Sequence, residues 1–303
     1  MTQTEKPNTS PSHGSAPHVP LIEGFAPLAN QYKGLICDLW GVVHNGQEAF
    51  PAACEALKTY RAQGGYVLLL SNAPRPSANV VTMLDRMNVP KDAYDDILTS
   101  GDATRDYLAS LGDTTKCFYI GPDRDQGLLP NPDSQKGSEE EAEYILCSGL
   151  YDDETETPEN YTELLKRLFA QGLKMICANP DVVVHRGEKM IYAAGALAQA
   201  YEKLGGEVRY FGKPHGPIYD AALERFAGLK NALGKSHLLA IGDGHHTDIR
   251  GAQGQNIDAL FITGGIAAEH VGETPAAPNQ EKLNTFCAEH DITPQAAMPY
   301  LVW

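Results

Sequence analysis

The sequence predicts an α/β protein in which parallel sheets are covered by helices on both faces. Short apolar runs end in Gly, Asn or Asp, and segments of helical length separate these runs. Such alternation is typical of parallel strands joined by crossover helices. The runs are more numerous than one compact sheet usually holds. At ~150 residues per domain, 303 residues also correspond to about two domains.

The expected strands are the apolar runs, and the expected helices are the longer segments between them. Strands are predicted at residues 34–38, 66–71, 96–99, 117–120, 144–147, 174–177, 208–211, 238–242 and 259–262. Helices are predicted at residues 52–63, 78–87, 104–111, 162–170, 194–204, 218–226 and 248–255, and from residue 280 onward. Two acidic stretches, residues 130–143 and 151–160, are predicted to be surface loops in the central portion of the chain.

Composition limits the classes of partner. The chain carries a formal net charge of −15 and is 42% hydrophobic, as expected for a globular protein with a sizeable core. A negative field repels nucleic-acid phosphates and anionic lipid headgroups, so we expect neither nucleic acid nor a membrane as a partner. No apolar run approaches the ~18 residues of a membrane helix.

The first residues and the cysteines bear on the location of the protein. Residues 1–20 are rich in Ser, Thr and Pro and lack the apolar segment of a secretory signal, which predicts a disordered tail. The six cysteines form no CxxC motif, and three of them lie in apolar, strand-like runs. We therefore expect reduced core cysteines in a cytoplasmic protein.

Asp38 stands where the first apolar strand becomes a turn, three residues before Gly41. The carboxyl ends of parallel strands form the edge at which open α/β sheets bind ligands. A carboxylate at this place fits a nucleophile or a ligand of a hard metal ion. It also fits an Asp that merely caps a turn.

Ser71 and Asn72 end a second apolar strand in the same way. Their short hydroxyl and amide groups are suited to hold an anionic oxygen. The prolines at positions 74 and 76 fit a plain turn equally well.

Lys213 lies between Gly212 and Pro214, just before a predicted helix. Glycine lets the backbone come close to a neighbour and proline fixes the direction of approach. We therefore expect the ammonium group to be aimed at a target, although a solvated surface lysine is the alternative.

Asp243 and Asp248 form an acidic pair after a further buried strand. Asp248 begins a predicted helix, where the helix dipole favours an acid. Two carboxylates converging on one strand end suggest Mg²⁺, which binds oxygen ligands and keeps several waters. His245 and His246 suggest zinc, but adjacent histidines in a turn seldom both ligate one ion, so we do not predict a zinc site.

The order of these four motifs resembles the haloacid-dehalogenase-like (HAD) hydrolase superfamily. About 140 residues separate Ser71 from Lys213, and Asn-Pro-Asp at positions 179–181 precedes Gly-Lys-Pro. A long αβ insertion at this point is similar to class IIA, the NagD-like branch, which includes pyridoxal, nitrophenyl and nucleotide phosphatases. The resemblance covers roughly residues 32–265.

The resemblance implies a domain organisation. A doubly wound, Rossmann-like core would comprise residues 21–105 and 210–303. Residues 106–209 would form an inserted α/β cap over the site, which excludes water and selects the leaving group. Assembly into a homo-oligomer through the cap is plausible for this branch.

The resemblance also implies catalytic and phosphate-binding roles. Asp38 would attack phosphorus and form an aspartyl-phosphate, with Lys213 neutralising charge on the nucleophile and the phosphate. Ser71 and the backbone of Asn72, together with Lys213, would bind the phosphoryl oxygens. Phosphoryl transfer needs positioning and charge stabilisation above all, so these residue types suit the task.

The implied metal is Mg²⁺. Its ligands would be the Asp38 carboxylate, the backbone carbonyl of Trp40 and Asp243. Asp248 would support the metal waters or Lys213. The implied substrate is a small phosphorylated metabolite.

The sequence departs from the family pattern at Trp40. The family carries DxDG, and here the motif is Asp38-Leu39-Trp40-Gly41. The second Asp of the family protonates the leaving alkoxide and later activates water, and an indole N–H is no useful acid or base. Losing a general acid/base typically costs ~10²–10⁴-fold in rate. We therefore expect metal binding to persist and hydrolysis of ordinary phosphate esters to be weak.

Three hypotheses follow. The first is a Mg²⁺-dependent phosphohydrolase whose leaving group needs no proton, or whose proton comes from His44, His245 or His246. The second is a metal-independent, dehalogenase-like hydrolase, which the pair Asp243 and Asp248 argues against. The third is a catalytically weak protein that binds a phosphate ligand and has a binding or regulatory function.

Some polar segments are assigned no catalytic role. Residues 179–181 fit a turn, since Asn-Pro favours turn initiation, and by resemblance they help to orient the cap. Arg75 and residues 123–125 are expected to be solvated surface groups.

Overall fold

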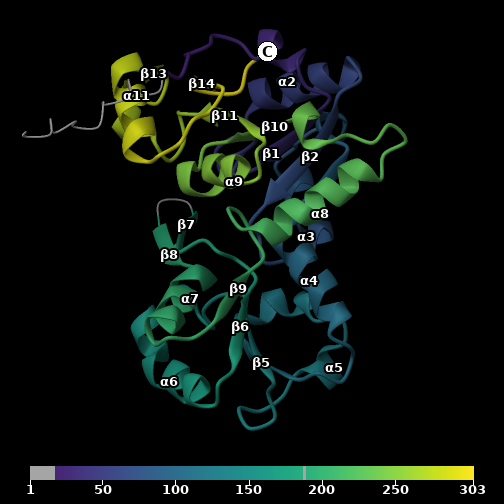
Figure 1. Cartoon of the computed structure of the whole chain (residues 1–303), viewed down its shortest axis with the longest axis vertical. Helices are drawn as coiled ribbons and strands as arrows, with labels where there is room; N and C mark the ends of the chain where they lie inside the picture. Colours follow the sequence, from purple (N-terminus) through teal and green to yellow (C-terminus); the bar gives the residue numbers. More distant parts are fainter. Residues whose placement is uncertain (1–17, 187–188) are drawn as a thin grey trace, which may run out of the picture.

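The computed structural model describes residues 18–186 and 189–303 and contains two parallel sheets at opposite ends of the long axis of the molecule (Figure 1). The expected α/β class, with a core sheet and a second sheet in an inserted cap, is confirmed. Among the described helices, none is long and apolar enough to cross a membrane.

The core sheet has six parallel strands in the order β14-β11-β10-β1-β2-β3. The strands are β1 (Gly34–Asp38), β2 (Tyr66–Ser71), β3 (Asp96–Thr99), β10 (Leu238–Gly242), β11 (Asp258–Ile262) and β14 (Ala296–Met298). The strand order reverses at β1, because β2 and β3 follow on one side and β10, β11 and β14 on the other. In open α/β sheets such a reversal opens a ligand-binding crevice at the carboxyl ends of the strands.

Helices cover both faces of this sheet, which explains its uninterrupted apolar strands. In β2, Leu68 and Leu70 belong to one buried cluster, whereas Val67 and Leu69 belong to the cluster on the opposite face. All four side chains are fully buried. A strand packed on both faces has no solvent-facing side, so it needs no polar alternation.

The longer helices around the core begin and end close to the expected positions. They are α2 (Pro51–Ala62), α3 (Ser77–Arg86), α4 (Ser100–Ser110), α8 (Gly216–Ala227) and α11 (Gln280–Glu289). Shorter elements are α1 (Ala26–Ala29), η1 (Lys91–Ala93), η4 (Lys235–His237), α10 (Ala268–Val271) and the strand pair β12 (Gly272–Thr274) and β13 (Ala277–Pro278). Helix α4 starts earlier than expected because Thr99 and Asp102 form a capping box at its amino end.

The helix expected over residues 248–255 is instead a π-helical turn, η5 (His245–Ile249), followed by the short helix α9 (Arg250–Gly254). The backbone N–H of Ile249 donates to the carbonyl of Gly244, five residues earlier, at 3.1 Å. This correction matters for function, because π-turns occur frequently at functional sites and this one carries Asp248.

The cap sheet has four parallel strands in the order β4-β5-β6-β9. They are β4 (Cys117–Ile120), β5 (Tyr144–Cys147), β6 (Lys174–Cys177) and β9 (Val208–Tyr210). The other cap elements are η2 (Asp123–Leu128), α5 (Pro132–Gln135), η3 (Pro158–Tyr161), α6 (Thr162–Ala170), α7 (Ala194–Lys203) and the antiparallel pair β7 (Val183–Arg186) and β8 (Lys189–Tyr192). Helices α6 and α7 contribute a buried cluster on this sheet through Leu165, Leu168 and Leu197.

The expected tail falls largely outside the description, since residues 1–17 are not among the described residues. Val19 is buried, and the backbone N–H of Ala297 donates to the carbonyl of Pro20 at 2.9 Å. Packing of the chain against β14 is therefore already established before residue 21. All six cysteines are buried and unpaired.

Candidate active site

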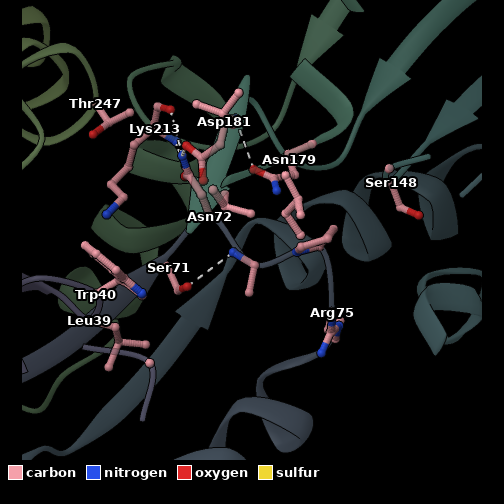
Figure 2. Close-up of a pocket in the computed structure, with 18 of the residues that line it drawn as sticks. Leu39, Trp40, Ser71, Asn72, Arg75, Ser148, Asn179, Asp181, Lys213 and Thr247 are labelled. Carbon is pink, nitrogen blue, oxygen red and sulfur yellow. Dashed lines mark hydrogen bonds between the residues drawn. The ribbon is translucent and has the colours of Figure 1, made fainter. Parts of the chain in front are cut away.

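The carboxyl ends of β1, β2 and β10 meet at a cavity of about 420 Å³ that is bounded by both the core and the cap. Asp38, Ser71 and Asp243 reach it from these three strand ends. Figure 2 shows Lys213, Ser71 and Trp40 gathered at one end of the cavity, with Ser148 of the cap at the other. The structure thus brings together the residues predicted to bind the metal and the phosphoryl group, whereas His245 and His246, two of the possible proton donors, are not among the described residues that line the cavity.

Lys213 is the centre of the polar cluster. Its Nζ donates to Asp38 Oδ1 at 2.5 Å, to Asp248 Oδ1 at 2.6 Å and to the backbone carbonyl of Leu70 at 3.0 Å. The residue is only 3% exposed. All three ammonium protons are therefore directed at buried acceptors, and the alternative of a solvated surface lysine is wrong.

The charges of this cluster depend on one another. Burial acts to lower the pKa of the Lys213 ammonium, but the adjacent carboxylates of Asp248 and Asp38 together raise it above its ordinary value. Burial, and then the negative charge of Asp248, raise the pKa of Asp38, and Lys213 offsets part of that rise. One lysine therefore compensates only part of the negative charge gathered here.

Asp243 is held close against two glycines, Gly41 and Gly265. Its Oδ2 accepts the backbone N–H of Ile266 at 3.0 Å. A Cβ atom at Gly41, whose φ is +81°, would lie 2.2 Å from that same oxygen. Glycine is thus required at position 41 both by the left-handed turn and by the close approach of the carboxylate. Burial and the charge of Asp248 raise the pKa of Asp243.

The donor set fits a hard divalent cation. Carboxylate oxygens of Asp38, Asp243 and Asp248 lie within 4.8 Å of one another. These side chains are buried or nearly so, with Asp38 12% and Asp248 6% exposed. Oxygen-only ligands of this kind suit Mg²⁺, and a dication would offset the charge that Lys213 leaves uncompensated.

Asn72 acts as a clamp on the lysine loop. Its Oδ1 accepts the backbone N–H of Lys213 at 2.7 Å, and its Nδ2 donates to the Lys213 carbonyl at 3.1 Å and to Asp181 Oδ1 at 2.8 Å. A Cβ at Gly212 would lie 2.6 Å from Asn72 Oδ1 and 2.4 Å from Pro180. The Asn72 side chain is therefore engaged in fixing Lys213, which leaves its backbone for an anion.

Ser71 accepts the backbone N–H of Ala73 at 3.2 Å through its Oγ, and its side chain lines the cavity (Figure 2). The hydroxyl proton of Ser71 remains available to donate to an anionic oxygen in the cavity.

His44, a candidate for the missing proton donor, also lines the cavity. Its Nδ1 accepts the backbone N–H of Gly46 at 2.9 Å, so the ring proton of the neutral form sits on Nε2. That Nε2 is buried and has no hydrogen-bond partner among the described residues. Burial lowers the pKa of His44 to about 4, and the ring is therefore neutral near pH 7.

Sequence reasoning missed two groups at the cavity. Asp181 was expected only in a turn, but it lines the cavity and bonds to Asn72. Arg75 and Asp125 were expected to be solvated, and instead Arg75 Nε donates to Asp125 Oδ1 at 2.6 Å, joining core to cap. The Asp125 side chain is 3% exposed, and burial raises its pKa while Arg75 partly offsets the rise.

The β7–β8 pair was also missed. It contributes apolar residues to the cavity, among them Val184 and Ile191. Its sequence signal was present, because two short runs rich in Val, Ile and Tyr flank a polar segment that contains a glycine.

Comparison with known proteins agrees with this geometry. A haloacid dehalogenase-like hydrolase profile matches residues 35–131, and a HAD-hydrolase-like profile matches residues 210–287. The crystal structure of a hydrolase of the haloacid dehalogenase-like family from Brucella suis 1330 is 42% identical, with a TM-score of 0.80, and the match covers 93% of this chain and 100% of that one.

Two more distant relatives have named activities. The chain is 24% identical over 252 residues to the 5'-nucleotidase YutF of Bacillus subtilis (strain 168), covering 82% of this chain and 93% of the relative. It is 24% identical over 257 residues to the ribonucleotide monophosphatase NagD of Escherichia coli (strain K12), covering 82% and 94%.

The chain belongs to the haloacid dehalogenase-like hydrolase family. Within that family its two-sheet arrangement and its relatives place it in class IIA, the NagD-like branch. It is a HAD-type hydrolase.

Proposed function

We propose that this protein is a Mg²⁺-dependent phosphohydrolase that acts through an aspartyl-phosphate on a small phosphorylated metabolite. The observation that carries the proposal is the Lys213 ammonium held between Asp38 and Asp248 beside Asp243, at the cavity between core and cap. Phosphoryl transfer requires positioned charge of this kind more than elaborate covalent machinery.

Each residue has a defined task in this proposal. A carboxylate oxygen of Asp38 attacks phosphorus, the bond from phosphorus to the leaving oxygen breaks, and Lys213 balances the charge that accumulates. Ser71 and the backbone of Asn72 bind the phosphoryl oxygens. Water then hydrolyses the aspartyl-phosphate and returns Asp38 and inorganic phosphate.

Asp38, the backbone carbonyl of Trp40 and Asp243 are the proposed Mg²⁺ ligands, with Asp248 in support. When bound, the cation supplies Lewis-acid stabilisation of the transferring phosphoryl group. Asp248 also holds Lys213 in place, since its Oδ1 accepts from the ammonium while its Oδ2 accepts from the Gly244 N–H at 3.0 Å.

The residue at position 40 points to the class of leaving group. Trp40 lies where the family carries its second Asp, and its indole cannot supply a proton. His44 is neutral near pH 7 and is a poor acid. We therefore propose substrates whose leaving group departs as an anion, such as acyl phosphates or activated aryl phosphates. The names of the relatives make a nucleoside monophosphate the appropriate comparison substrate.

We propose that residues 106–209 act as the cap and that the catalytic core comprises residues 21–105 and 210–303. The Arg75–Asp125 ion pair and the Asn72–Asp181 bond both join the two parts beside the cavity. Assembly through the cap belongs to the same proposal and is supported by the exposed apolar side chains of Met190 and Tyr192 on β8. Sedimentation of the full chain tests it.

The other two hypotheses predict different results in one experiment. The purified protein is given p-nitrophenyl phosphate, acetyl phosphate, a nucleoside monophosphate and 2-chloropropionate, each with and without Mg²⁺. Phosphate release that EDTA suppresses and Asp38→Asn abolishes supports the proposal. Halide release without metal indicates a dehalogenase, and phosphate binding with no turnover indicates a regulatory protein. Either of these two results contradicts the proposal.

A further inference from the structure

A second cluster of potential metal ligands lies outside the carboxylate site. His245 and His246 come from the π-turn η5, and His290 caps the carboxyl end of α11. One nitrogen from each ring lies within 4.8 Å of the others. The ring centroids are 4.0 Å apart for His245 and His246, and 4.3 Å for His245 and His290. Residues 45 positions apart in the sequence thus form one imidazole group.

The cluster is organised by its surroundings. Phe286 packs against both His245 and His290, with centroid separations of 4.9 and 4.3 Å. Arg250 Nη2 donates to the His290 carbonyl at 2.7 Å, and Gln253 Nε2 donates to the Asp291 carbonyl at 3.1 Å. The end of α11 is therefore tied to α9, directly after the turn that carries the other two rings.

One ring nitrogen of this cluster lacks a partner. His245 Nδ1 is buried and has no hydrogen bond to any described residue. Leaving a buried ring nitrogen unsatisfied costs free energy, and such a group calls for an explanation. His246 is exposed, so the cluster is open to solvent on one side.

We propose that His245, His246 and His290 form a binding site for a divalent transition-metal ion of the Zn²⁺ class, distinct from the Mg²⁺ site. Three imidazoles with no carboxylate among them favour zinc, copper or nickel over Mg²⁺. Tetrahedral Zn–N bonds of ~2.0–2.1 Å place ligand nitrogens about 3.4 Å apart. The three ring nitrogens lie within 4.8 Å of one another, so binding requires the rings to move closer together, and water would complete the coordination.

The proposed zinc site shares a turn with residues of the carboxylate site. The same π-turn holds His245 and His246 and continues to Asp248, and Asp243 precedes it by two residues. An ion bound by His290 as well would fasten this turn to α11. The adjacent guanidinium of Arg250 opposes a cation, so we expect an affinity below that of a structural zinc site.

The experiment titrates the full chain with Zn²⁺ in excess Mg²⁺, which occupies the carboxylates, and reads free Zn²⁺ with a chromophoric chelator. We expect one equivalent of Zn²⁺ to bind. His246→Ala and His290→Ala should each weaken binding by at least about tenfold, since even an outer-shell change commonly costs that much. His237→Ala, an exposed histidine in η4, is the matched control and should bind as the unaltered chain does.

Two further measurements keep the test decisive. Asp243→Asn should retain the Zn²⁺ site, because that site needs no carboxylate, and this readout is independent of phosphatase activity. Cu²⁺ bound to the chain should show imidazole nitrogen hyperfine structure in its EPR spectrum. The proposal is overturned if binding is unchanged in both histidine variants, or if Asp243→Asn abolishes it. His246 is exposed, so its variant is not expected to compromise folding.

Discussion

The core sheet and the cap sheet share one architecture and differ in what their strand ends carry. In the core, β1 and β10 end at the buried carboxylates Asp38 and Asp243, and Lys213 is paired beside them. In the cap, β5 ends at Ser148, whose Oγ lies 2.8 Å from the Tyr119 hydroxyl. Both edges face the same cavity. The core edge thus carries the Lys213–carboxylate cluster. The cap side contributes the Ser148–Tyr119 hydroxyl pair and the carboxylates of Asp125 and Asp181, which bond to Arg75 and Asn72 of the core. We therefore expect the chemistry at the core edge.

The largest expected effect comes from replacing the nucleophile. Asp38→Asn should lower kcat by about 10⁴-fold or more, because the other two carboxylates are held elsewhere, Asp248 by Lys213 and Asp243 by the Ile266 N–H. Ser148→Ala is the matched change at the cap edge and should alter kcat less than about tenfold. Steady-state kinetics on p-nitrophenyl phosphate measure both. Equal losses in the two variants would contradict the division of roles.

Removing the buried ammonium group of Lys213 tests how the core edge is held together. Lys213→Met leaves Asp38 and Asp248 without their partner, and breaking a buried ion pair costs about 3–5 kcal/mol of unfolding free energy. Urea unfolding in the presence of EDTA measures the loss. Lys235→Met, at an exposed lysine, should stay within about 0.5 kcal/mol. A similar, small loss in both variants would refute the account of Lys213.

Restoring an aspartic acid at position 40 should increase activity toward alkyl phosphates. Trp40→Asp is expected to raise kcat/KM for an alkyl phosphate by about 10²-fold, since an aspartic acid at this position supplies the missing proton. Activity toward an acyl phosphate should change far less, because that leaving group needs no proton. A variant that folds, binds Mg²⁺ and remains inert on the alkyl phosphate would show that the role given to position 40 is wrong.

The smallest expected effect concerns the ion pair that joins core to cap. Burial raises the pKa of Asp125 in the folded protein above its ordinary value. Between these two pKa values the folded protein binds more protons than the unfolded chain, so the free energy of unfolding falls as pH rises. Arg75→Met removes the compensating charge and should cost about 1–2 kcal/mol at about pH 8, and less at about pH 5, because the raised pKa makes protonation of Asp125 easier as pH falls. Urea unfolding at both pH values measures this difference.

The double variant Arg75→Met/Asp125→Asn is the control, because it removes the buried charge together with its partner. The dependence on pH should disappear in it. An equal loss at the two pH values in Arg75→Met alone would argue against a buried, titrating Asp125.

The sequence was sufficient to predict five of the six core strands and the residues that meet at the core edge, whereas the short strand β14 was not predicted. Strands such as β1 and β2 are continuous apolar runs, because both of their faces are buried, and each ends at a polar residue that marks the edge. Since parallel strand ends meet at one edge, Asp38 and Asp243 were predictable as neighbours although about 200 residues separate them.

The remaining features depend on partners that no local pattern identifies. Arg75 resembles any surface arginine until the cap places Asp125 against it. The pair His245 and His246 gave little reason to expect a metal until the end of α11 brought His290 beside them. The π-turn is formed by backbone bonds from the Ile249 N–H to the Gly244 carbonyl and from the Arg250 N–H to the His245 carbonyl, for which the helical pattern of residues 248–255 contained no signal.

The central claim is phosphoryl transfer to Asp38 without a proton donor at position 40, and a leaving-group series tests it most directly. Values of kcat/KM are measured with Mg²⁺ on phosphate monoesters whose leaving alcohols or phenols span a wide range of pKa. The account predicts a steep fall in rate as the leaving-group pKa rises, and a shallower fall in Trp40→Asp. A rate in the unaltered protein that does not depend on leaving-group pKa, while chemistry limits turnover, would contradict it.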